Sequence, residues 1–99
     1  MFTIGLDIGT TNICVAMTEM ETRRLVKTVT LKNDSFVVGE KPFQKMQDPE
    51  KIFGIVKKAL SELMNTNTDI GAIGVTGQMH GIVYCDKSGK HVSPLFTWQ

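Results

Sequence analysis

The stretch of sequence that decides the fold of this chain is IGLDIGTTN, residues 4–12. An apolar strand carries one carboxylate, Asp7, and breaks at Gly9 into a short polar turn. Within residues 2–8 the apolar residues stand at alternate positions, which predicts a β-strand with one buried face. The small residues on the opposite face, Thr3 and Gly5 beside Asp7, leave room for a ligand or a closely packed layer.

The turn that follows this strand is suited to a nucleotide triphosphate and its metal. Asp7 stands one residue before the strand ends, where its carboxylate can reach a hydrated Mg²⁺, which keeps several of its waters. Gly9 allows the backbone to approach a ligand closely. The amides and hydroxyls of Thr10 and Thr11 can then donate to phosphate oxygens. The alternative is an ordinary hairpin with Asp and Gly at its tight turn.

The next residues predict an antiparallel meander followed by a helix. Residues 13–18 and 25–31 read as a second and a third strand, joined by the polar residues 19–24. Residues 32–47 give no clear prediction, because a short strand at 36–38 competes with the glycine and proline around it. Asp48 is a good helix N-cap with Pro49 at the first helical position, and apolar residues recur at helical spacing up to residue 64.

The last third of the chain predicts a parallel strand and a hairpin. Residues 70–75 form a short apolar segment after the helix, so we expect a crossover connection and parallel pairing with an earlier strand. Residues 82–85, 86–89 and 90–96 read as strand, turn and strand. The predicted fold class is therefore α/β.

Composition excludes several classes of protein. Apolar residues make up 41% and charged residues 21%, as in ordinary globular domains. Eleven basic and ten acidic residues leave a net charge of +1 without a basic stripe, so we expect no nucleic-acid partner. The apolar runs are far shorter than the roughly 20 residues that cross a bilayer, so we expect no membrane partner. Without a signal peptide or a Cys-x-x-Cys motif, Cys14 and Cys85 predict reduced thiols in a cytoplasmic protein.

A second motif, TGQMHG at residues 76–81, follows the predicted parallel strand. Its glycines bracket Gln78, Met79 and His80 on a loop at the edge of the sheet where ligands of α/β proteins gather. Gln and neutral His each offer a donor and an acceptor, and Met offers an adaptable apolar contact, which suits a polyhydroxylated ligand. The alternative is a solvated loop histidine. No second ligand stands at metal-binding spacing, so we expect no protein-only metal site.

These motifs together resemble the FGGY family of carbohydrate kinases, and within it the xylulokinases and sedoheptulokinases. The resemblance rests on Asp7-x-Gly9-Thr10-Thr11, on Gly77-Gln78-Met79-His80-Gly81 and on Thr97-Trp98-Gln99. It implies that residues 1–99 are the N-terminal portion of the first ribonuclease H-like, or actin-like, ATPase domain of such an enzyme. The second half of that domain and the second domain would lie outside this chain.

The resemblance also implies the roles of the motif residues in an ATP- and Mg²⁺-dependent phosphorylation of a ketose. Asp7 would orient the phosphates through the waters of Mg²⁺, and Gly9, Thr10 and Thr11 would contact them. The sugar side would be lined by Gln78, Met79, His80, Trp98 and Gln99. The catalytic base would lie further along the protein, so this chain alone should be inactive.

Two other interpretations remain open from the sequence. An Hsp70-like or actin-like ATPase switch that binds protein partners would suit residues 4–15, but it gives the Gln-Met-His loop nothing to do. A small self-standing binding module conflicts with the apolar segment at residues 95–98, which leads us to expect a longer protein. The full-length protein could be a homodimer.

Overall fold

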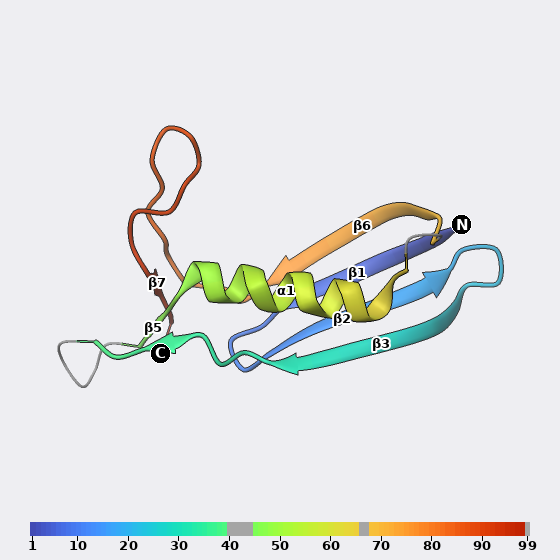
Figure 1. Ribbon diagram of the computed structural model, residues 1–99, viewed down its shortest axis with the longest axis horizontal. Helices are drawn as coiled ribbons and strands as arrows, with labels where there is room; N and C mark the ends of the chain where they lie inside the picture. The colour runs from blue at the N-terminus through green and yellow to red at the C-terminus, as the bar shows by residue number, and fades with distance from the viewer. Residues whose placement is uncertain (40–44, 66–67, 99) are drawn as a thin grey trace.

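The computed structural model describes residues 1–39, 45–65 and 68–98 of the chain, and in this part a four-stranded sheet carries one helix on one of its faces (Figure 1). The strand order in this sheet is β3-β2-β1-β6. A second, smaller sheet has the order β4-β5-β7. The elements of the larger sheet are β1 (Phe2–Ile8), β2 (Asn12–Glu19), β3 (Arg24–Lys32) and β6 (Ile70–Gly77). The others are β4 (Phe36–Val37), β5 (Met46–Gln47), α1 (Pro49–Leu63) and β7 (Leu95–Phe96).

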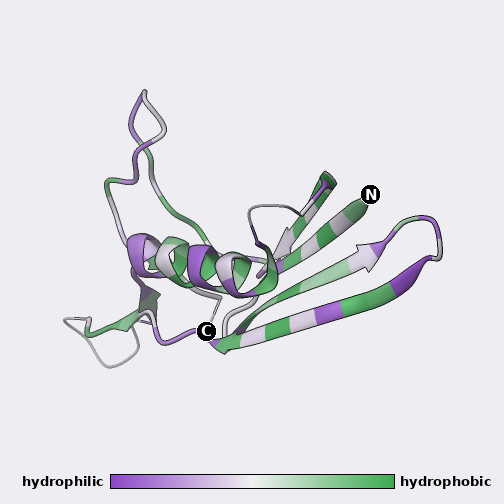
Figure 2. Cartoon of the chain, turned by 45° about the vertical axis from the view of Figure 1, so that its right-hand side comes forward, coloured by the Kyte–Doolittle hydropathy of each residue, from purple (hydrophilic) through white to green (hydrophobic). Residues whose placement is uncertain are grey.

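The first three strands form the predicted antiparallel meander. Leu6 of β1 lies opposite Val15 of β2, and Val15 lies opposite Val29 of β3, so one face of the three strands is apolar. Figure 2 shows apolar and polar residues alternating along β1 and β3. Lys27 lies opposite the core residue Met17 and therefore on the helix side, where its Nζ donates to the Glu62 carbonyl at 2.7 Å; the β2–β3 register shifts beyond this pair.

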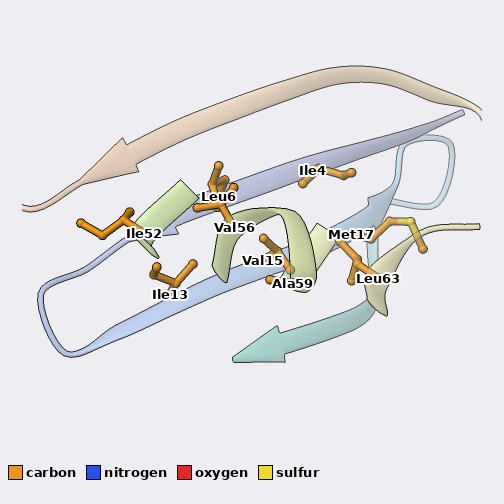
Figure 3. Close-up of a cluster of buried hydrophobic side chains, with 9 residues drawn as sticks. All are labelled: Ile4, Leu6, Ile13, Val15, Met17, Ile52, Val56, Ala59 and Leu63. Carbon is orange, nitrogen blue, oxygen red and sulfur yellow. The ribbon is translucent and has the colours of Figure 1, made fainter. Parts of the chain in front are cut away.

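Helix α1 covers the apolar face of the sheet and supplies the other half of the core. Its start is confirmed as predicted, because the Asp48 side chain accepts a hydrogen bond from the Glu50 amide and Pro49 follows it. The helix ends at Leu63, close to the predicted end. Fully burying one such aliphatic side chain contributes about 1.5–3 kcal/mol. The core residues are Ile4, Leu6, Ile13, Val15, Met17, Ile52, Val56, Ala59 and Leu63 (Figure 3).

Strand β6 determines where the loops of the candidate site lie. It pairs parallel to β1, as predicted, with Leu6 opposite Val75 and Ile8 opposite Gly77. The strand runs two residues beyond the predicted segment, to Gly77. Because parallel strands end at the same edge, the turn after β1 and the loop after β6 leave the sheet side by side.

The predicted hairpin at residues 82–96 is only partly correct. Its two arms meet at the isolated bridges Ile82–Phe96 and Cys85–His91, and the regular strand β7 pairs instead with β5. The reason is local: the Ser93 hydroxyl accepts the Tyr84 amide hydrogen in place of a backbone carbonyl, and the following proline has no N–H for a ladder.

The turn within this segment is confirmed and is organised around Asp86. Its Oδ1 accepts hydrogen bonds from the Ser88 hydroxyl at 2.7 Å and from the Lys90 amide at 3.0 Å. These donors, Ser88 first, hold the pKa of the Asp86 carboxyl below its ordinary value, because they stabilise the charged form.

The region 32–47, for which there was no clear prediction from the sequence, contains the short strands β4 and β5, paired through Phe36–Gln47 and Val37–Met46.

Both cysteines are free thiols, and Cys85 is exposed. Within the described residues, no helix has the length and apolar character needed to cross a membrane.

Candidate functional site

The candidate site is a shallow cavity of about 310 Å³ at the edge of the sheet where β1 and β6 end. Two loops that are far apart in the sequence form its walls, one directly after each strand. The lining residues are Asp7, Gly9, Thr10, Gly77, Gln78, Met79, His80 and Trp98.

The turn after β1 is tight because Gly9 has no side chain. Its amide donates to the Asn12 carbonyl at 2.9 Å, and a Cβ added at Gly9 would lie only 2.6 Å from that same oxygen. In the described part of the chain, the backbone amide hydrogens of Thr10 and Thr11 donate to no protein acceptor. These two donors are therefore available to an anionic ligand, as in backbone nests that bind phosphate.

Asp7 is exposed and lines the cavity, and its side chain lies on the sheet face opposite α1. Among the described residues, the Asp7 side chain has no hydrogen-bond or ion-pair partner. No group of three or more His, Cys, Asp or Glu side chains gathers anywhere in that part of the chain. A single free carboxylate fits a hydrated Mg²⁺, which takes one or two protein carboxylates and keeps its waters, and it does not fit a closed structural metal site.

The loop after β6 presents Gln78, Met79 and His80. The backbone N–H of Gln78 donates to the Ile8 carbonyl at 2.9 Å, so the pairing of this loop with β1 continues one residue beyond β6. His80 adopts a left-handed backbone conformation, φ 63°, which is uncommon for a residue other than glycine and is found at functional sites. The Met79 side chain is 70% exposed.

Hydrogen bonds join the two loops directly. The Thr10 hydroxyl donates to Gln78 Oε1 at 3.0 Å and accepts from the indole Nε1 of Trp98 at 3.3 Å. Gln78 Nε2 in turn donates to Gln47 Oε1 at 2.8 Å, and Gln47 Nε2 donates to the Thr10 carbonyl at 3.0 Å. The Thr10, Gln47 and Gln78 groups thus form a closed ring of three hydrogen bonds.

Sequence reasoning missed two residues of this site, Gln47 and Asn33. Both are buried polar residues from the region without a clear prediction. Asn33 stabilises the turn through two hydrogen bonds. Its side-chain Nδ2 donates to the Gly9 carbonyl at 2.9 Å, and its backbone N–H donates to the Thr11 carbonyl at 2.8 Å. The only sequence signal for Gln47 is its place directly before the helix N-cap.

Most of the residues predicted for the site lie together. Thr11 belongs to the same turn but is not among the residues that line the cavity. Gln99 lies outside the described residues. The predicted residues that line the cavity are Asp7, Gly9, Thr10, Gln78, Met79, His80 and Trp98.

This fold and site define a class of α/β domain in which a tight Gly-Thr-Thr turn and a polar loop lie next to each other at one edge of a mixed sheet. Residues 2–99 match the N-terminal domain of the FGGY family of carbohydrate kinases, and the chain belongs to this family. The recognition made from the three motifs is therefore confirmed. The match also favours the sugar-kinase interpretation over the Hsp70-like switch.

Individual relatives agree with this assignment. The chain is 26% identical over 98 residues to a xylulose kinase of Escherichia coli, covering 96% of this chain and 19% of that protein. It is 29% identical over 101 residues to a xylulose kinase of Staphylococcus epidermidis, with the same coverage of 96% and 19%. The chain thus spans about a fifth of the length of these relatives.

Solved structures confirm the actin-like, ribonuclease H-like fold. The structure of a xyloylose kinase from Brucella ovis matches with a TM-score of 0.85 and 25% identity, over 99% of this chain and 21% of that one. A Plasmodium falciparum glycerol kinase solved with ADP shares the fold alone, with a TM-score of 0.78 and 21% identity, over 98% of this chain and 20% of that one.

Proposed function

We propose that the full-length protein transfers a phosphoryl group from ATP to a ketose, and that this chain supplies the loops that face the phosphates and the sugar. The observation that carries the proposal is the hydrogen bond of 3.0 Å between Thr10 and Gln78, which holds the two loops across one cavity in a member of the FGGY family. Phosphoryl transfer depends mainly on positioning and on charge stabilisation, so a fixed distance between these loops is what the reaction requires.

The phosphate side of the proposed site is the turn after β1. Asp7 would hold Mg²⁺ through water, and Gly9 would let the phosphates approach the backbone. The bound Mg²⁺ would neutralise charge on the phosphate oxygens. Because the Thr10 hydroxyl already donates to Gln78, we propose that Thr10 and Thr11 contact the phosphates through their amide hydrogens.

The sugar side is the loop after β6. A glutamine amide has two donor hydrogens and two acceptor lone pairs, and Gln78 uses one of each within the protein. One donor and one acceptor remain for sugar hydroxyls. Met79 and His80 would contact the sugar beside it, with Trp98 and Gln99 closing that side.

The rest of the reaction needs the rest of the protein. The attacking sugar hydroxyl requires a base and the nucleotide requires an adenine pocket. Since the relatives are about five times as long as this chain, we propose that both lie outside residues 1–99. We also propose that residues 1–99 are the first part of domain I and are inactive alone.

The test is ADP release by the full-length gene product with ATP, Mg²⁺ and a panel of acceptors. Xylulose, sedoheptulose, gluconate and glycerol cover ketoses, a sugar acid and a short polyol. We expect a ketose to be the best acceptor by kcat/KM, as the xylulose kinase relatives support. ATP hydrolysis that no sugar accelerates, and that an unfolded peptide stimulates, would instead support the chaperone-like switch.

A further inference from the structure

We propose that Gln47 is a positioning residue that couples the turn after β1 (residues 9–12) to the loop after β6 (residues 77–81), so that the proposed phosphate and sugar sides of the site keep one fixed separation. This inference rests on the proposed function and concerns a residue that lies in none of the three sequence motifs. Gln47 is not among the residues that line the cavity, so it acts through Thr10 and Gln78 and not on a ligand.

Both atoms of the Gln47 amide are used, and each serves a different loop. Its Nε2 donates to the Thr10 carbonyl at 3.0 Å, and its Oε1 accepts from Gln78 Nε2 at 2.8 Å. Only one orientation of the amide satisfies both partners, because a carbonyl cannot donate and an N–H cannot accept. That orientation also fixes the Gln78 amide, whose Oε1 then faces the Thr10 hydroxyl.

Gln47 can act as a fixed point because its own backbone is held on several sides. It is the last residue of β5 and pairs with Phe36 of β4 and Leu95 of β7. The next residue, Asp48, donates its amide hydrogen to the Ser35 carbonyl at 2.8 Å and caps α1. The side chain is 0% exposed, so water does not compete for its hydrogen bonds.

The ring formed by Thr10, Gln47 and Gln78 therefore links the catalytic edge of the large sheet to the small sheet and the helix. The two hydrogen bonds of Gln47 in this ring span 31 and 37 residues of sequence, so the ring is a tertiary contact and not a local one. Each loop on its own can still meet its ligand when the ring is broken. What changes is the alignment of phosphate and sugar, which matters in the transition state and so affects kcat more than either KM.

The test uses two substitutions in the full-length protein with ATP and the best ketose. Gln47→Met keeps the length of the side chain but removes both hydrogen bonds. We expect kcat to fall about 10- to 100-fold while each KM stays within about threefold, the pattern of lost alignment. Leu63→Ala is the matched control, because it perturbs the buried core at the far end of α1 without touching the ring, and it should keep kcat per folded molecule.

Gln47→Glu provides a readout that a merely structural role would not give. The carboxylate can still accept from Gln78 but repels the Thr10 carbonyl, whereas the protonated acid can donate to it. Burial favours the protonated form. The kcat of this variant relative to wild type should therefore rise as the pH falls, and that of Gln47→Met should not depend on pH.

Amide hydrogen exchange separates this inference from the proposed function. Gln47→Met should speed exchange in both segments 9–12 and 77–81 while leaving the core strand segment 13–19 unchanged. If the wild-type protein phosphorylates no acceptor, the proposed function fails and the exchange result still decides the coupling. Unchanged kcat in an active protein, a rise in the sugar KM alone, or faster exchange in only one of the two loops would each overturn the role of Gln47.

Discussion

Substituting Gly9 by alanine should damage the site far more than the single added methyl group suggests. The new Cβ would lie 2.6 Å from the Asn12 carbonyl oxygen, and ordinary contact begins at 3.4 Å. The turn must therefore open by about 0.8 Å, and the obstacle is backbone that no side-chain rotation can move away. The same oxygen accepts the Gly9 amide hydrogen at 2.9 Å, so the movement also weakens the bond that closes the turn.

Two magnitudes follow from this geometry. Losing one intramolecular hydrogen bond costs about 0.5–1.5 kcal/mol of stability. A displacement approaching 1 Å at a positioned reacting group costs on the order of 100-fold in rate. We therefore expect Gly9→Ala to lower kcat by about 10- to 100-fold in the full-length protein, equivalent to roughly 1.4–2.7 kcal/mol of transition-state stabilisation.

The assay is steady-state ADP release together with thermal unfolding of the same preparations. The matched control is Gly54→Ala on helix α1, where an added Cβ meets nothing within 4 Å. Alanine in a helix interior is favoured over glycine by about 1 kcal/mol, so this variant should be more stable and equally active. A Gly9→Ala protein whose kcat stays within about twofold of wild type would refute the argument that this turn has no space for a side chain.

Three further predictions concern the other parts of the site and its scaffold. Asp7→Ala should lower kcat by about 100-fold or more, because a metal-positioning contact matters mostly in the transition state; an unchanged kcat would remove Asp7 from the site. His80→Ala should raise the sugar KM and leave the ATP KM near normal, whereas equal effects on both would indicate a structural histidine. Asp48→Ala removes the acceptor of the Glu50 amide at 2.9 Å and should cost about 1 kcal/mol in denaturant unfolding, with no change of m-value.

The elements predicted correctly are those whose signals are short in range. Alternation along β1 gave its bounds and its buried face, and the Asp48–Pro49 pair gave the start of α1. These patterns work because a strand face repeats every two residues and a helix cap involves only neighbouring groups. The hairpin predicted over 82–96 was only partly correct for the same reason: its turn depends on neighbouring residues and is present, but Ser93 and its neighbouring proline interrupt the ladder between the two arms.

The sequence by itself identified most of the residues that line the candidate site, because Asp7, Gly9 and the Gln-Met-His loop are recognisable from residue type and from their place at strand ends. It did not determine how the loops are held together. The side-chain hydrogen bonds of Gln47 and Asn33 span 24 to 37 residues of sequence and depend on where β5 and the segment after β3 lie in space. Only the parallel pairing of β6 with β1 brings the two loops to one edge, and only a buried amide with both atoms satisfied can fix their separation.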